Sequence, residues 1–153
     1  MKRIASALLI SGLATALFCG CETMQTQAKP PPYMTEAVIR TLTDIFDGSW
    51  GGVSVYVEKS AWLPDDLKSA GKVPVTITTI KELIKMHESA DTAPAIAIVD
   101  ANQEKDGQIK VTVKYTPVRI KGLESSTKGG SFEYVYKMIN EKLIMVSRLK
   151  PII

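Results

Sequence analysis

The stretch 108-QIKVTVKY-115 alternates between polar and apolar residues along its whole length. Its apolar positions are Ile109, Val111, Val113 and Tyr115, and the polar positions between them include Lys110, Thr112 and Lys114. A period of two residues predicts a β-strand with one buried face and one solvated face. This strand is the reference point for the segments on either side of it.

Three further segments around this strand have the composition of strands. They are residues 95–101, 131–139 and 142–149, and the last two are separated only by Asn140-Glu141, which predicts a tight hairpin turn. After Pro117 the apolar residues change parity to Val118 and Ile120, which predicts a bulge at Pro117. Consecutive strands with short connections predict an antiparallel meander.

The N-terminal half carries helix signals. Thr35 is a candidate N-cap for a helix over 36–46, and Thr79 with Glu82 has the form of a capping box for a helix that begins at Ile80 and runs to about Ser89. Between them we expect a strand over 53–58, one or two helical turns within 59–71, and an edge strand over 73–77 that contains Pro74.

This order of elements predicts an α+β fold, with N-terminal helices packed on one face of a mainly antiparallel curved sheet that ends in a C-terminal β-meander. In element order alone, the chain resembles the nuclear-transport-factor-2-like fold. That resemblance implies a cone-shaped sheet that often holds a pocket.

The first 21 residues have the features of an export signal. Lys2 and Arg3 precede an apolar run of 15 residues, shorter than the roughly 20 residues of a transmembrane helix. The run leads into Cys19-Gly20-Cys21, which resembles the lipobox of bacterial lipoproteins, although Phe18 stands where that family usually has Leu. The resemblance implies cleavage between Gly20 and Cys21 and acylation of Cys21 by chains such as palmitate.

The same resemblance predicts the location of the protein. Glu22 rather than Asp follows the cysteine, which in that class favours the outer membrane, with the domain facing the periplasm. We therefore expect a signal peptide over 1–20, a lipidated Cys21 with a Pro-rich tether over 21–34, and one α+β domain over 35–153. The expected contact with the membrane is through the acyl chains on Cys21.

Charge is divided unevenly along the chain. Residues 21–107 hold 8 Lys or Arg against 13 Asp or Glu, whereas residues 108–153 hold 9 against 3. The best candidate for an interaction surface is the basic row on the polar side of the central strand and just beyond it, together with the aromatic loop at Trp50. Its residues are Trp50, Lys110, Lys114, Arg119 and Lys121. A solvated sheet face is the simpler interpretation of the lysines.

The sequence gives little support for a metal site, a cofactor or a catalytic pair of carboxylates. His87 is the only histidine, and neither cysteine is expected to remain free in the mature chain, so we expect no metal site of His or Cys ligands and no cofactor. The loop Asp100–Gly107 does not have the spacing of an EF-hand, and the pair Asp65-Asp66 is better explained as capping a helical turn.

We therefore expect a membrane-anchored periplasmic lipoprotein that is not an enzyme and acts as a binding or scaffolding module of the cell envelope. Its partner would be an envelope protein and not nucleic acid. The alternative is a small-ligand binder or minor hydrolase with a pocket. In that alternative the aromatic residues Phe132, Tyr134 and Tyr136 would line the pocket, whereas the simpler interpretation places them in the core.

Overall fold

A computed structural model describes residues 29–47, 54–124 and 128–149 of the chain. The described residues form two helices and seven strands. In chain order these are α1 (Pro32–Asp47), β1 (Val55–Glu58), β2 (Ser69–Ala70), β3 (Val73–Thr78), α2 (Ile80–Met86), β4 (Ala95–Gln103), β5 (Gln108–Pro117), β6 (Gly130–Ile139) and β7 (Lys142–Leu149). The expected α+β class is confirmed.

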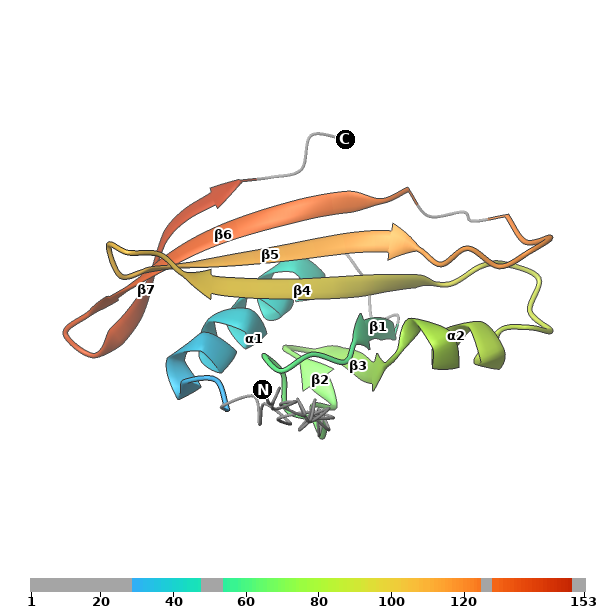
Figure 1. Ribbon diagram of the computed structural model, residues 1–153, viewed down its shortest axis with the longest axis horizontal. Helices are drawn as coiled ribbons and strands as arrows, with labels where there is room; N and C mark the ends of the chain where they lie inside the picture. Colours follow the sequence, from blue (N-terminus) through green and yellow to red (C-terminus); the bar gives the residue numbers. More distant parts are fainter. Residues whose placement is uncertain (1–28, 48–53, 125–127, 150–153) are drawn as a thin grey trace, which may run out of the picture.

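The strands form one mixed sheet in the order β2-β3-β1-β4-β5-β6-β7. The short strand β1 runs parallel to both of its neighbours, β3 and β4, and every other pairing is antiparallel. The predicted C-terminal meander is therefore present as β4 to β7. Figure 1 shows the long strands β4, β5 and β6 lying side by side, with the shorter strands beyond β4.

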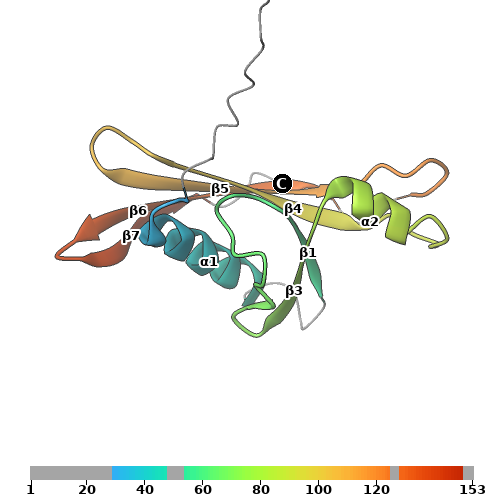
Figure 2. The same ribbon diagram turned by 60° about the horizontal axis from the view of Figure 1, so that its bottom comes forward.

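Helix α1 covers one face of this sheet, as Figure 2 shows. Its buried stripe includes Val38, Leu42 and Phe46, which recur at helical spacing because three or four residues complete each turn. These side chains share one core with the inward residues of β1, β4, β5 and β6. In β5 the inward residues are Ile109, Val111 and Val113, which are the apolar set that the alternation predicts.

Helix α2 packs on the opposite face, so the expectation that the helices share one face is wrong. Its buried residue Leu83 joins Ile96 and Val118 in a second, smaller apolar cluster, against which Tyr56 also packs. Tyr56 and Ile96 are paired across β1 and β4, and their chain neighbours Val57 and Ala97 point into the main core. Successive residues of a strand point to opposite faces.

Several local predictions differ from the structure in their bounds. Helix α1 begins at Pro32 and not after Thr35, because proline suits the first turn, where its missing N–H costs no hydrogen bond. Residues 59–71 have turns and the two-residue strand β2 in place of helical turns. Strand β3 is not an edge strand, since β2 pairs with it and places Pro74 opposite Ser69.

The capping box of α2 is confirmed. The Thr79 side chain accepts a hydrogen bond from the Glu82 amide at 3.2 Å, and the Thr79 amide donates to Glu82 Oε2 at 3.0 Å. The helix ends at Met86, earlier than expected, and the amide of His87 closes its last turn on the Ile84 carbonyl.

The predicted bulge at Pro117 is wrong. Strand β5 keeps a regular register with β4 up to the pair Pro117–Ala95, and the parity change arises because the chain then leaves the sheet and buries Val118 under α2. The irregularity in register instead lies between β6 and β7, at Val135 and Tyr136. The hairpin that joins β6 to β7 turns through Asn140 and Glu141, both with positive φ, as a type I′ turn requires.

Candidate interaction surface

The face of β4, β5 and β6 that points away from α1 is the setting of the predicted basic row; we call it the outer face. It is formed by alternate residues of each strand, namely Ile98, Asp100 and Asn102 of β4, Lys110, Thr112 and Lys114 of β5, and Ser131, Glu133, Val135 and Lys137 of β6. Within the described residues, α2 covers only the end of this face that carries Ile96 and Ile98.

Lys110 is on the outer face but forms an ion pair there. Its Nζ lies 2.7 Å from Glu133 Oε2 on β6, a pairing between neighbouring strands. The hydrogen bond to Glu133 raises the pKa of Lys110. A partly exposed pair of this kind contributes little to stability. It does reduce the charge that Lys110 presents to a partner, so the predicted basic row is weaker at this position.

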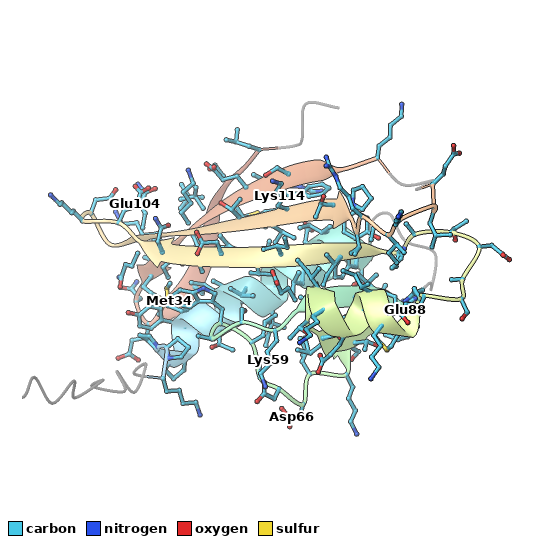
Figure 3. The ribbon with its side chains drawn as sticks, turned by 45° about the vertical axis from the view of Figure 1, so that its right-hand side comes forward. Met34, Lys59, Asp66, Glu88, Glu104 and Lys114 are labelled. Atoms are coloured by element: carbon cyan, nitrogen blue, oxygen red, sulfur yellow. The ribbon has the colours of Figure 1, made fainter. Side chains whose placement is uncertain are left out.

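Lys114 is the member of the predicted row that best fits a docking surface. It is exposed, it lies between Ile98 and Ser131 in the register, and Figure 3 shows it on the side of the sheet away from Met34 of α1. Lys137 of β6 is exposed on the same face and pairs with Gln108. The sequence did not place Lys137 in the predicted row, because the pairing of β5 with β6 was needed to locate it.

The other members of the row are not brought onto this face. Arg119 and Lys121 are exposed, but they follow the end of β5 in a connection that leads away from the sheet. Trp50 lies outside the described residues. Of the predicted cations, Lys114 and the paired Lys110 lie on the outer face, where the structure adds Lys137, and the role of Trp50 stays a prediction.

The inner face of β6 carries the aromatic residues. Tyr134 and Tyr136 are fully buried, and Phe132 packs against the same core. The Tyr134 hydroxyl donates to Asp44 Oδ2 at 2.5 Å, and Arg148 completes the group with Nη1 2.9 Å from the same oxygen and its guanidinium 5.4 Å above the Tyr134 ring. The core interpretation of these aromatic residues is confirmed for the two tyrosines.

The second tyrosine also bonds to α1. Its hydroxyl lies 2.9 Å from Thr41 Oγ1, and Thr41 uses its own proton on the Ala37 carbonyl, so Tyr136 is the donor. Burial raises the pKa of both Tyr134 and Tyr136 above the usual value, and for Tyr134 the bond to Asp44 raises it further. The hydrogen bonds of these two hydroxyls therefore join β6 to α1.

The residues considered for catalysis or metal binding have ordinary structural contacts. His87 Nδ1 lies 3.0 Å from the Leu83 carbonyl, and its ring meets the edge of Tyr56. Asp65 pairs with Lys59 at 3.1 Å in a turn, so its predicted role at the start of a helical turn is wrong. Asp106 accepts hydrogen bonds from Gln108 in the β4–β5 loop. Among the described residues no group of three His, Cys, Asp or Glu side chains is placed to hold a metal ion.

Three surface clefts of the described residues have no lining side chains from β4, β5 or β6, and two of them are candidates for a ligand. The first, of about 570 Å³, is formed where the chain enters α1, between Pro30–Pro32 and the turn that contains Leu63 and Pro64. The second, of about 550 Å³, runs along α2 beside Ile80 and Ile84. Both are shallow and open, and neither is lined by the aromatic residues of β6.

A feature that sequence reasoning missed is a set of aliphatic residues exposed around β7. Its members are Ile139, Ile144, Met145, Val146 and Leu149. The signal was the unbroken apolar run 143-LIMV-146, in which the expected alternation of an edge strand is absent. Ile144 lies opposite Lys137 and Leu149 opposite Glu133, so these two side chains extend the outer face onto β7.

Comparison with known proteins returned no match to a family model, to a curated protein or to a solved structure. Among the described residues, no helix has both the length and the apolar character needed to cross a bilayer.

Proposed function

We propose that this chain is a lipid-anchored protein of the bacterial cell envelope whose domain is a binding or scaffolding module without catalytic activity. The anchor is Cys21, and the domain faces the periplasm from the outer membrane. This part of the proposal is supported by the lipobox-like residues 18–21 and the cationic, apolar segment before them.

The observation that supports a binding role is the composition of the outer face. A sheet face that carries exposed lysines beside the aliphatic residues Val135, Ile144 and Leu149 combines the charge and the apolar area of a docking surface. The partner that suits it is an envelope protein with acidic residues around an apolar centre. The alternative of a pocket behind the sheet has less support, because Tyr134 and Tyr136 fill that space.

The anchor is tested by Cys21→Ser in cells that are fed a labelled fatty acid. The wild-type chain takes up label and sediments with membranes, whereas the Cys21→Ser chain loses the label and leaves the membrane fraction. The matched control is Cys19→Ser, which keeps both properties. Equal labelling of the Cys21→Ser chain and the wild type would refute the anchor.

The docking surface is tested by charge reversal at Lys114 and Lys137, which carry no ion pair among the described residues. Lys110 is left unchanged, because its reversal would also leave Glu133 unpaired. In-cell crosslinking with the wild type captures a partner, and the variant Lys114→Glu/Lys137→Glu loses it. The control Lys81→Glu/Lys85→Glu makes the same change of charge on α2 and retains capture. Undiminished capture by the first variant would exclude the outer face.

A further inference from the structure

Strand β7 leaves one side of the sheet open. It is the last strand in the sheet order, it is 8 residues long, and within residues 29–47, 54–124 and 128–149 it pairs only with β6. The opposite edge is different, because β2 has only 2 residues. Proteins protect exposed edges by shortening them, as at β2, or by placing charges on them. The long edge at β7 has neither protection along its centre, Ile144 to Val146, where its only irregularity is the register shift that leaves Val146 without an opposite residue on β6.

The exposed apolar side chains of β7 lie on both of its faces. Ile144 is opposite Lys137 on the outer face, whereas Met145 is opposite the buried Tyr136 and lies on the inner side. A flat partner that docks on one face of a sheet covers only one of these sets. A strand added beside β7 contacts both, because neighbouring strands share each face of a sheet. The apolar side chains on both faces of β7 are therefore arranged as they would be if a further strand paired with this edge.

We propose that β7 pairs edge to edge with β7 of a second copy of this chain, in antiparallel orientation. The strand that complements Ile144, Met145 and Val146 must itself be apolar on both faces, and β7 meets this requirement. Its exposed aliphatic residues are continuous in the centre, and its cations, Lys142 and Arg148, lie toward the two ends.

The charges of β7 are compatible with this pairing. With the twofold axis between Met145 and Val146, Lys142 faces Leu149 of the partner strand. The two copies of Lys142 then stand about 24 Å apart at about 3.4 Å per residue, which is well beyond the roughly 8 Å screening length at physiological salt. Arg148 is already engaged by Asp44 of its own chain. No cation is therefore forced against another.

The size of the contact indicates how strong the pairing is. A strand of this length spans about 27 Å, and with a sheet thickness of about 10 Å it offers a strip of roughly 270 Å² per copy, against about 800 Å² in a standard stable interface. The bulge at Val135 and Tyr136 further limits the regular length. The dimer is therefore weak in dilute solution. Attachment of both copies to one membrane, which rests on the proposed anchor, raises their effective concentration toward the millimolar range.

The test uses thiol crosslinking of the full chain. Val146→Cys places a thiol beside the twofold axis, so a short bis-maleimide joins two copies. Met86→Cys is the matched control, because Met86 has the same exposure, 56% against 54% for Val146, but lies at the end of α2. The reaction is run on envelope membranes and on the purified full chain at about 1 mM, a concentration comparable to that on a shared membrane.

The expected result is a crosslinked dimer at least fivefold more abundant for Val146→Cys than for Met86→Cys. Adding Ile144→Lys to the Val146→Cys chain reduces this product, because it places a charge in the paired centre. Equal products from the two cysteine variants under both conditions, or a product whose mass is that of a different protein, would overturn the proposal. The sedimentation of each sample with membranes reports on the anchor separately, so failure of one proposal is distinguishable from failure of the other.

Discussion

Tyr134 and Asp44 are separated by 90 residues in the chain, yet the Tyr134 hydroxyl donates to the Asp44 carboxylate at 2.5 Å. The bond joins the middle of β6 to α1 at the edge of the main core. Arg148 of β7 reaches the same carboxylate, so one acidic side chain on the helix receives groups from two strands. The contacts of Asp44 with Tyr134 and Arg148 lead to specific predictions for the stability of the protein.

Tyr134→Phe removes one donor from Asp44 and keeps the packing of the ring. The expected loss is about 1–2 kcal/mol in the free energy of unfolding, since a hydrogen bond to a charged group is stronger than a neutral one, while the ion pair with Arg148 remains. Tyr136→Phe is the comparison, with an expected loss of about 0.5–1 kcal/mol, because Thr41 keeps its bond to the Ala37 carbonyl. Urea unfolding followed by circular dichroism measures both. A larger loss for Tyr136→Phe would contradict this ranking.

Stability is expected to fall in alkaline solution. The pKa values of Tyr134 and Tyr136 are raised in the folded state, first by burial, so the folded protein holds these protons more tightly than the unfolded chain does. Their contribution is fully present below the unfolded pKa of about 10 and is lost as the pH rises through the folded-state values. The measurement is the free energy of unfolding against pH. The variant Tyr134→Phe/Tyr136→Phe should show a flatter alkaline limb, and an unchanged slope would refute the assignment.

The capping box at Thr79 and Glu82 allows a local test. Thr79→Ala leaves the Glu82 amide without its side-chain acceptor, and the expected cost is about 1 kcal/mol in the free energy of unfolding. Thr79→Ser keeps the oxygen and is expected to have nearly wild-type stability. Thermal unfolding compares the three proteins. Equal destabilisation by alanine and serine would show that the effect comes from packing and not from the cap.

Gly71 has a left-handed backbone with φ of 62°, and a Cβ at this position would collide with the Asp47 carboxylate. Gly71→Ala is therefore expected to cost about 2 kcal/mol in the free energy of unfolding, part from backbone strain and part from displacing Asp47, which accepts from the Lys72 amide. Gly107→Ala is the control, because its φ is 80° but its surroundings are open, so only the strain of about 1 kcal/mol remains. Equal losses would mean that the Asp47 contact is unimportant.

Local patterns in the sequence predict the local parts of this fold. The alternation of 108–115 identifies β5 and its inward residues, and the spacing of Thr79 and Glu82 identifies the start of α2. The parallel position of β1 between β3 and β4 has no such signal, because it depends on contacts between segments far apart in the chain. The placement of α2 on the opposite face follows from that arrangement and was missed for the same reason.

For the candidate interaction surface too, the sequence predicts the local features and not those that depend on contacts between distant segments. The sequence indicates that Lys110 and Lys114 share a strand face, but only the pairing of β5 with β6 reveals that Glu133 neutralises Lys110 and that Lys137 joins the face. The apolar run 143-LIMV-146 was visible, yet a run of this kind is equally typical of a buried strand. Its exposure is a property of the sheet order, which places β7 at the end.

The packing of α1 also determines when this protein is able to fold. The helix is among the first elements along the chain, but its apolar stripe shares a core with all seven strands, and its polar bonds to the sheet are completed by β6 and β7. Until the last third of the polypeptide has left the ribosome, α1 lacks the part of the core that β5, β6 and β7 supply, and its own helical propensity is weak. The complete packing of α1 is therefore a late event in the synthesis of this protein, because its core and its hydrogen bonds depend on the C-terminal strands.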